Sequence, residues 1–137
     1  MNGWYNIKGV LIARNVAELH SDANNINKDT ALDEKGDAPN DRTKTPNQHD
    51  ILTGSRDDGT AFIGGSGGGV PFPDMTCGNW TKGTAEGCAM TGHFDRNGPV
   101  SASWVKSWNS SHPTIGCSME KIRPTGGDGR LYCFAAN

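Results

Sequence analysis

The sequence has no long apolar run. Apolar stretches such as residues 10–13 are only a few residues long, whereas a membrane helix needs about 20 consecutive apolar residues. Such stretches are also too short for the core of a signal peptide, and the first residues carry no basic cluster. We therefore expect no membrane span, and we expect a mature chain or a piece of a longer polypeptide.

The chain also has no excess of one charge. It carries 13 basic and 15 acidic residues, a net charge of -2, and they are spread along the sequence. A nucleic-acid-binding surface usually shows a basic patch or stripe. This pattern predicts no nucleic-acid partner.

The four cysteines are not spaced for metal or redox chemistry. Cys77, Cys88, Cys117 and Cys133 form no C-x-x-C pair, so the main signal of zinc ribbons, thioredoxin-type sites and c-type haem is missing. An even number of cysteines in a glycine-rich chain with a small core favours disulfides. This predicts a secreted protein, extracellular or periplasmic.

Short elements and turns dominate what remains. Nineteen glycines and seven prolines separate short apolar runs in a chain of 137 residues that is 34% hydrophobic, which suits one domain with a modest core. We expect a strand within residues 5–12, a helical turn at 16–19, a strand near 49–54, and short strands at 76–81, 87–93, 103–108 and 130–135. Residues 21–48 have few apolar anchors and are predicted to be a long surface excursion.

Five motifs carry a family resemblance. They read TCGNWT (76–81), GHFDR (92–96), SWNSSH (107–112), GCS (116–118) and TGGDGRLYCFA (125–135). Together they resemble bacterial lectin-like domains, which are related in fold to endostatins and C-type lectins. The resemblance implies an α+β, C-type-lectin-like fold over residues 1–137: a twisted antiparallel sheet with long loops, few short helices and disulfide bonds.

The resemblance also implies a disulfide pattern. Cys77–Cys117 would be the inner bridge, and Cys88–Cys133 is then the intrachain way to use the other two cysteines. The local pattern, Cys77–Cys88 with Cys117–Cys133, stays open. Relatives begin with a helix whose cysteine pairs with the one in the last strand, and this sequence begins after that helix. We therefore expect an oligomer or a partner chain, to which Cys133 could be bridged with Cys88 left free.

Catalytic patterns are weak. Ser110, Ser111 and His112 adjoin one another, and Asp95 or Asp128 is a candidate third member of a triad, but no Gly-x-Ser-x-Gly turn is present. The second half also offers no pair of carboxylates for glycosidase chemistry. The sequence therefore predicts no enzyme.

Cofactor signals are weak as well. Trp108 and Asn109 stand where calcium-dependent lectins carry Trp-Asn-Asp, but Ser110 replaces the acidic residue, which counts against calcium. His93 and His112 could ligate a transition metal with Asp95, but their spacing matches no standard zinc pattern. We expect no metal and no other cofactor.

The resulting functional hypothesis is a non-catalytic extracellular binding module that recognises a glycan or a protein surface. The alternative is a structural subunit of a multi-chain surface assembly. The candidate ligand-binding residues are Trp104, Trp108, Asn109, His112, His93 and Asp95.

Overall fold

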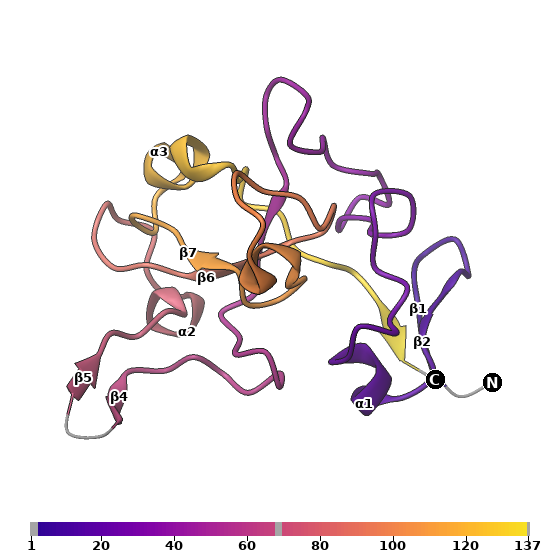
Figure 1. Cartoon of the computed structure of the whole chain (residues 1–137). Coiled ribbons are helices and arrows are strands. Elements are labelled where there is room, and N and C mark those ends of the chain that lie inside the picture. Colours follow the sequence, from indigo (N-terminus) through magenta and orange to yellow (C-terminus); the bar gives the residue numbers. More distant parts are fainter. Residues whose placement is uncertain (1–2, 68–69, 137) are drawn as a thin grey trace.

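The computed structural model describes residues 3–67 and 70–136. Its elements are short and are joined by long irregular connections (Figure 1). In chain order they are β1 (Trp4–Tyr5), β2 (Leu11–Ala13), α1 (Val16–Leu19), β3 (Asp50–Leu52), β4 (Gly65–Gly67), β5 (Val70–Phe72), α2 (Cys77–Trp80), β6 (Met90–His93), the 3-10 turn η1 (Ser103–Lys106), β7 (His112–Pro113), α3 (Met119–Ile122), the 3-10 turn η2 (Arg123–Thr125) and β8 (Ala135–Ala136).

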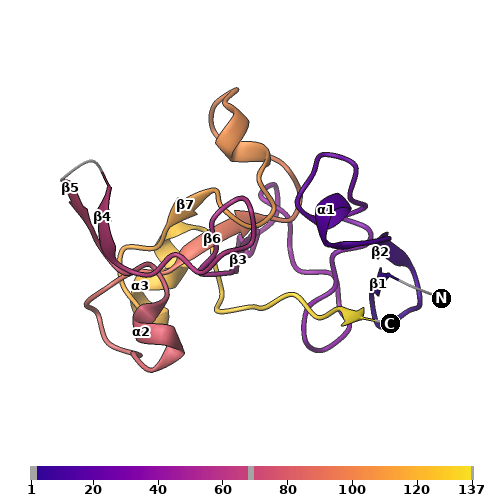
Figure 2. The same cartoon turned by 90° about the horizontal axis from the view of Figure 1, so that it is seen from below.

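The strands form two three-stranded antiparallel sheets and a hairpin. The strand orders are β2-β1-β8 and β3-β6-β7, and β4 pairs with β5. Because β1 pairs with β8, the first and last strands lie side by side, as both views show (Figures 1 and 2). The predicted α+β class with antiparallel sheets and few short helices is therefore confirmed, and the C-type-lectin-like assignment stays a prediction.

The predicted helical turn at 16–19 is confirmed as α1. The Asn15 side chain accepts a hydrogen bond of 2.8 Å from the Glu18 backbone N–H, which satisfies one of the donors that a helix start leaves unpaired. The Glu18 carboxylate accepts in return from the Arg14 backbone N–H at 2.6 Å. These local bonds explain why so short a segment holds a helical turn.

Three predicted strands take other forms. Residues 76–81 contain the turn α2, residues 103–108 contain the 3-10 turn η1, and in 130–135 only Ala135 enters a strand. The side chains of Asp74 and Thr76 receive the backbone N–H groups of Gly78 and Asn79 at 2.7 and 2.8 Å. Such side-chain bonds offer the backbone an alternative to a sheet ladder.

The main core lies between the first sheet and the start of β3. Its buried members are Ile12, Ala13, Leu19, Ile26, Ala31, Ile51 and Phe94. Trp4, Trp108, Tyr132 and Phe134 pack against this cluster as partly buried rings. A smaller cluster surrounds the Cys77–Cys117 bridge.

The segment 21–48 contains no helix or named strand, but it is not only a surface excursion. Ile26, Ala31 and Leu32 are buried in it, and Asp33 forms a bridge with Tyr132 and an ion pair with Arg130. The few apolar anchors thus bring the segment onto the core, and they help to cover the ring face of Tyr132 and Phe134. Most of the other residues of the segment are exposed or half-buried.

One of the two expected disulfides is present. Cys77 and Cys117 are bonded, which excludes the local pairing pattern, while Cys88 and Cys133 are free thiols. Cys133 is exposed because its neighbours Tyr132 and Phe134 turn inward to the core, and successive side chains of an extended segment point to opposite sides. Cys88 is half-buried with its Sγ 3.5 Å from the Asp74 carbonyl oxygen. The expected Cys88–Cys133 bridge is therefore not formed.

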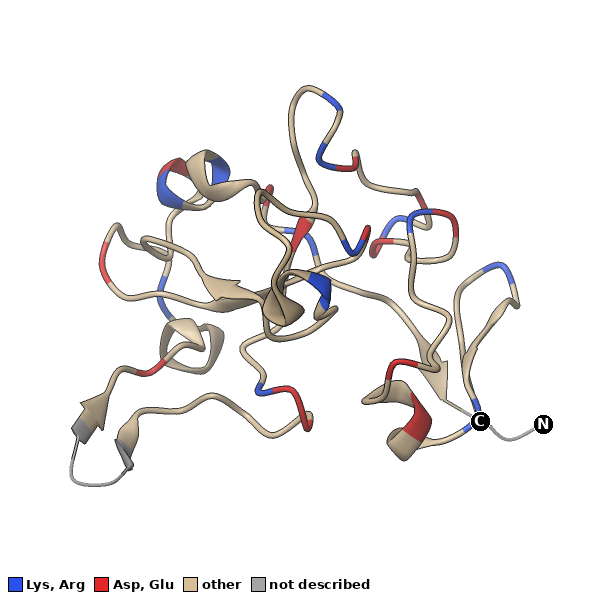
Figure 3. Cartoon of the chain, in the orientation of Figure 1, with Lys and Arg blue, Asp and Glu red and all other residues tan. Residues whose placement is uncertain are grey.

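Charged residues of both signs are interspersed over the fold, and neither sign gathers on one element (Figure 3). Over the described residues, no helix is long and apolar enough to cross a bilayer.

Candidate functional site

The candidate residues from the sequence fall into two neighbouring pockets. Trp104, Trp108 and Asn109 line the first, which we call the polar pocket. His93 and His112 line the second, the histidine pocket, together with Trp104. Trp104 therefore stands between them. Asp95 lies behind the histidine pocket, bound to His49.

The polar pocket has a volume of about 260 Å³ and joins distant parts of the chain. Four parts of the chain contribute to its wall. They are the residues that follow α1, the loop at Asp57, Arg96, and η1 with the three residues after it. Its lining is His20, Ser21, Asp22, Asp57, Arg96, Ser103, Trp104, Lys106, Ser107, Trp108 and Asn109.

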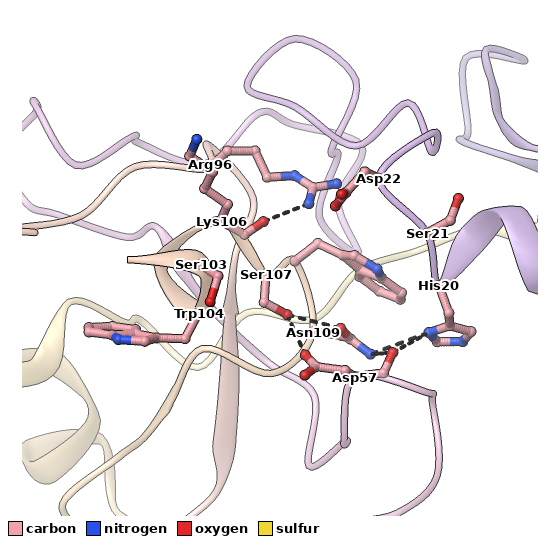
Figure 4. Close-up of a pocket in the computed structure, with 11 residues that line it drawn as sticks. His20, Ser21, Asp22, Asp57, Arg96, Ser103, Trp104, Lys106, Ser107 and Asn109 are labelled. Carbon is pink, nitrogen blue, oxygen red and sulfur yellow. Dashed lines mark hydrogen bonds between the residues drawn. The ribbon is translucent and has the colours of Figure 1, made fainter. Parts of the chain in front are cut away.

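A hydrogen-bond network forms one side of the polar pocket (Figure 4). Ser107 Oγ donates to Asp57 Oδ1 at 3.0 Å, and His20 Nδ1 lies 3.1 Å from the Asp57 carbonyl oxygen. Asn109 Nδ2 donates to the Arg56 carbonyl oxygen at 2.8 Å, and the side chain is buried. Asn109 therefore fixes the loop at 55–57 and has little left to offer a ligand.

Some other side chains that line the polar pocket have no hydrogen-bond partner. Within the described part of the chain, the side chains of Asp22, Ser103 and Lys106 form no hydrogen bond or ion pair. Arg96, by contrast, is held by the carbonyl oxygens of Ile26 and Lys106. In Figure 4 the Trp104 ring points away from the network of Ser107, Asn109 and His20. The polar side chains of this pocket without a hydrogen bond are thus one carboxylate, which lies beside the Arg96 guanidinium (Figure 4), one ammonium and one hydroxyl.

The histidine pocket is built by the register of the second sheet. Asp50 of β3 lies opposite His93 of β6, and His112 of β7 lies opposite Thr91. Thr91 and His93 are two residues apart and share a face of the strand, and directly opposed residues share that face too. Three strands therefore bring Asp50, His93 and His112 to one place, and His49 precedes β3.

The Nε2 atoms of three histidines surround the Asp50 carboxylate. Those of His49 and His93 lie 3.1 and 3.2 Å from Oδ1, and that of His112 lies 3.4 Å from Oδ2. The Asp50 side chain is 1% exposed, whereas that of His112 is 30% exposed and faces a pocket of about 330 Å³. Gly126 closes the cluster: a Cβ there would lie 3.2 Å from Asp50 Oδ2.

The other ring nitrogen of each histidine faces a different acceptor. His49 Nδ1 lies 3.1 Å from Asp95 Oδ1, and His93 Nδ1 lies 2.9 Å from the Val105 carbonyl oxygen. His112 Nδ1 lies 3.2 Å from the Pro113 carbonyl oxygen. These contacts fix the orientation of all three rings.

Electrostatics couple the members of the cluster. Burial of Asp50 acts to raise its pKa, but His112, His93 and His49 outweigh burial and keep that pKa below its ordinary value. In return the contact with Asp50 raises the pKa of His112, against the effect of its own burial. For Asp95, burial is likewise outweighed, by His49 and the Arg42 backbone N–H, so its pKa is lowered.

The structure does not arrange Ser111 as a nucleophile. Ser111 Oγ lies 3.2 and 3.3 Å from the two ring nitrogens of His93, so it sits beside the ring and not in line with either nitrogen. It also donates to the Trp104 carbonyl oxygen at 3.0 Å. A base must be within reach of the nucleophile and aligned with its proton. The Ser111 hydroxyl proton is instead donated to the Trp104 carbonyl oxygen.

Sequence reasoning found only half of the cluster. It grouped His93 and His112 with Asp95, whereas the structure gathers them on Asp50, and His49 alone contacts Asp95. Asp50 and His49 were missed because strand register is not visible in residue spacing. One signal was present: three of the chain's four histidines take part.

Neither a protein-family model, nor a curated protein, nor a solved structure matches this chain. Its function is therefore inferred from its own geometry.

Proposed function

We propose that the chain is a non-catalytic, extracellular binding module of the C-type-lectin-like class, and that its polar pocket binds a saccharide. The observation that carries this proposal is the lining of that pocket, where free Asp22, Ser103 and Lys106 side chains surround a preformed hydrogen-bond network. Ligand sites are concave and place a few polar groups on a rigid frame. Carboxylate, hydroxyl and ammonium groups are suited to the several hydroxyls of a sugar.

The size of the pocket narrows the ligand class. At about 260 Å³ it lies just below the range of about 300–1,000 Å³ typical of drug-sized ligands. A single sugar residue, at the end of a longer glycan, suits this volume. The Trp108 indole in the wall supplies an apolar surface beside the polar groups.

The Cys77–Cys117 bridge supports the extracellular setting, since disulfides persist in oxidising compartments. In the described residues, the misalignment of Ser111 and His93 supports a module without hydrolytic chemistry.

A glycan array followed by calorimetric titration with the best-binding saccharide tests the proposal. Asp22→Asn and Lys106→Ala should each weaken binding about 10-fold or more, because a hydrogen bond to a charged group contributes about 1.5–3 kcal/mol. Asp58→Asn and Lys8→Ala are the matched controls, since both residues are exposed and lie outside the pocket. Absence of any saccharide binding, or binding that Asp22→Asn and Lys106→Ala leave unchanged, would contradict it.

The second candidate function is a structural subunit. It is favoured by a larger, mostly apolar pocket of about 510 Å³ that Leu52, Trp80 and Leu131 help to line. Trp80 and Leu131 are exposed there, and exposed apolar patches often mark protein contacts. Sedimentation velocity distinguishes the two: a subunit should self-associate and lose this on Leu131→Asp, whereas a free binding module should sediment as a monomer.

A further inference from the structure

The Asp50 carboxylate is buried without hydrogen-bond partners. Both of its oxygens are inaccessible to solvent, and neither receives a hydrogen bond, although three imidazole nitrogens lie within 3.1–3.4 Å. The three nitrogens are therefore close to the carboxylate without forming a well-aligned hydrogen bond to it. An unpartnered buried carboxylate costs several kcal/mol unless something compensates its charge.

The contacts of the three Nδ1 atoms determine where the imidazole protons lie. The Nδ1 atoms of His49, His93 and His112 face a carboxylate or a carbonyl oxygen, which can only accept. Each Nδ1 therefore carries a proton, and in a neutral imidazole the Nε2 is then a lone pair. In a charged ring, which the contact with Asp50 favours for His112, the Nε2 carries a second proton instead. When the rings are neutral, these lone pairs lie beside the Asp50 carboxylate in one buried space, with the His49 and His93 rings stacked 4.2 Å apart, and nitrogen and carboxylate donors of this kind are ligands for a cation.

The spacing of these atoms suits a metal ion. Ligands about 2.0–2.2 Å from a tetrahedral zinc ion are about 3.3–3.5 Å apart, and the observed N–O separations are 3.1–3.4 Å. Donor atoms of His49, Asp50 and His93 all lie within 4.8 Å of one another. His112 reaches the same carboxylate from the pocket side.

The second layer of contacts has the pattern of a metal site too. Ligating histidines usually give their other ring N–H to a carboxylate or a backbone carbonyl, which fixes the ring and makes it a better ligand. Asp95 does so for His49, and the Val105 and Pro113 carbonyl oxygens do so for His93 and His112.

We propose that His49, Asp50, His93 and His112 form a binding site for a divalent transition metal of the zinc class. Imidazole ligands favour zinc and its neighbours, whereas calcium prefers six to eight oxygens. The donor atoms of His49, Asp50 and His93 already lie within 4.8 Å of one another, and His112 has to move toward the ion to become the fourth ligand, which closes the site and makes it structural. It links β3, β6 and β7, so the ion clamps all three strands of the second sheet. This inference is independent of saccharide binding in the other pocket.

Zinc alone, titrated calorimetrically into the chelator-treated chain with its disulfide intact, tests the site. We expect one zinc ion per chain and a higher melting temperature, because a ligand that binds only the folded state stabilises it. Cobalt should give the visible absorption of a tetrahedral nitrogen and oxygen site, without a thiolate charge-transfer band. A dissociation constant above about 0.1 mM would overturn the proposal, because structural zinc sites bind far more tightly than that.

Variants locate the ion. His93→Gln should weaken zinc binding about 100-fold or more, and His112→Gln, at the half-exposed position, should weaken it with less risk to folding. His20→Gln, which changes the histidine outside the cluster, and Cys88→Ser with Cys133→Ser should leave affinity unchanged. Loss of binding in the serine variant would assign the ion to the thiols instead.

Nuclear magnetic resonance of the unaltered chain removes any dependence on variants. Zinc should shift the ring nitrogens of His49, His93 and His112 and leave those of His20 in place. A shift confined to His20, or no ring shift, would contradict the assignment.

Discussion

At the scale of single residues, Asp50 determines the chemistry of the second sheet. It is among the most buried polar side chains, yet it faces three imidazoles and no aligned donor. A carboxylate in that position either binds a cation or destabilises the fold. The surrounding contacts, with every Nδ1 tied to an acceptor, favour the cation.

Asp95 is the residue whose replacement tests how these rings are held. Asp95→Ala removes the acceptor of His49 Nδ1 and also frees the Arg42 backbone N–H, which now lies 2.9 Å from Asp95 Oδ2. Loss of such an outer partner typically weakens metal binding about 10–100-fold, and we expect that range for zinc in calorimetry. The control, Asp58→Ala, should bind zinc as the unaltered chain does, and equal affinity in both variants would count against the role of Asp95.

At the scale of elements, β6 is covered on both faces. All four of its residues are buried, and the segment around Trp108 passes directly over Gly92. A Cβ built on Gly92 would lie 1.6 Å from the Trp108 carbonyl oxygen. The close approach places Ser107 and Ser111 where they bond to the β6 backbone, and it thereby positions the walls of both pockets.

Gly92→Ala should therefore destabilise the protein strongly. We expect a loss of at least about 3 kcal/mol in the free energy of unfolding, since the backbone must move to admit a methyl group. Gly83→Ala is the matched control: nothing lies within 4 Å of a Cβ there, so its effect should stay within about 0.5 kcal/mol. Urea unfolding of the two variants measures the difference in stability. Similar unfolding midpoints would show that the Trp108 segment does not lie this close to Gly92.

The elements that local sequence determines could be predicted. The α1 turn follows from the Asn15 cap, and β3 and β6 follow from short apolar runs near turns. The turn η1 was expected as a strand, because nothing in its own residues shows that Val105 must pack over Gly98. The candidate site was predicted only in part for a similar reason: the pairing of Asp50 with His93 joins residues far apart in sequence.

At the scale of the whole molecule, a small core is supplemented by cross-links. The Cys77–Cys117 bridge joins residues 40 apart, and Asp33 ties the segment 21–48 to the residues before β8 through Arg130 and Tyr132. A metal ion on the histidine cluster would add a third tie, across β3, β6 and β7. Domains with little apolar material often depend on such links.

X-ray absorption spectroscopy of the zinc-loaded chain tests the central claim most directly, because it reports the atoms around the ion. We expect four nitrogen or oxygen neighbours at about 2.0–2.2 Å, with the outer-shell scattering of three imidazoles and no sulfur. A sulfur neighbour at about 2.3 Å, or a shell of oxygen without imidazole scattering, would show that the ion does not occupy the site of His49, Asp50, His93 and His112.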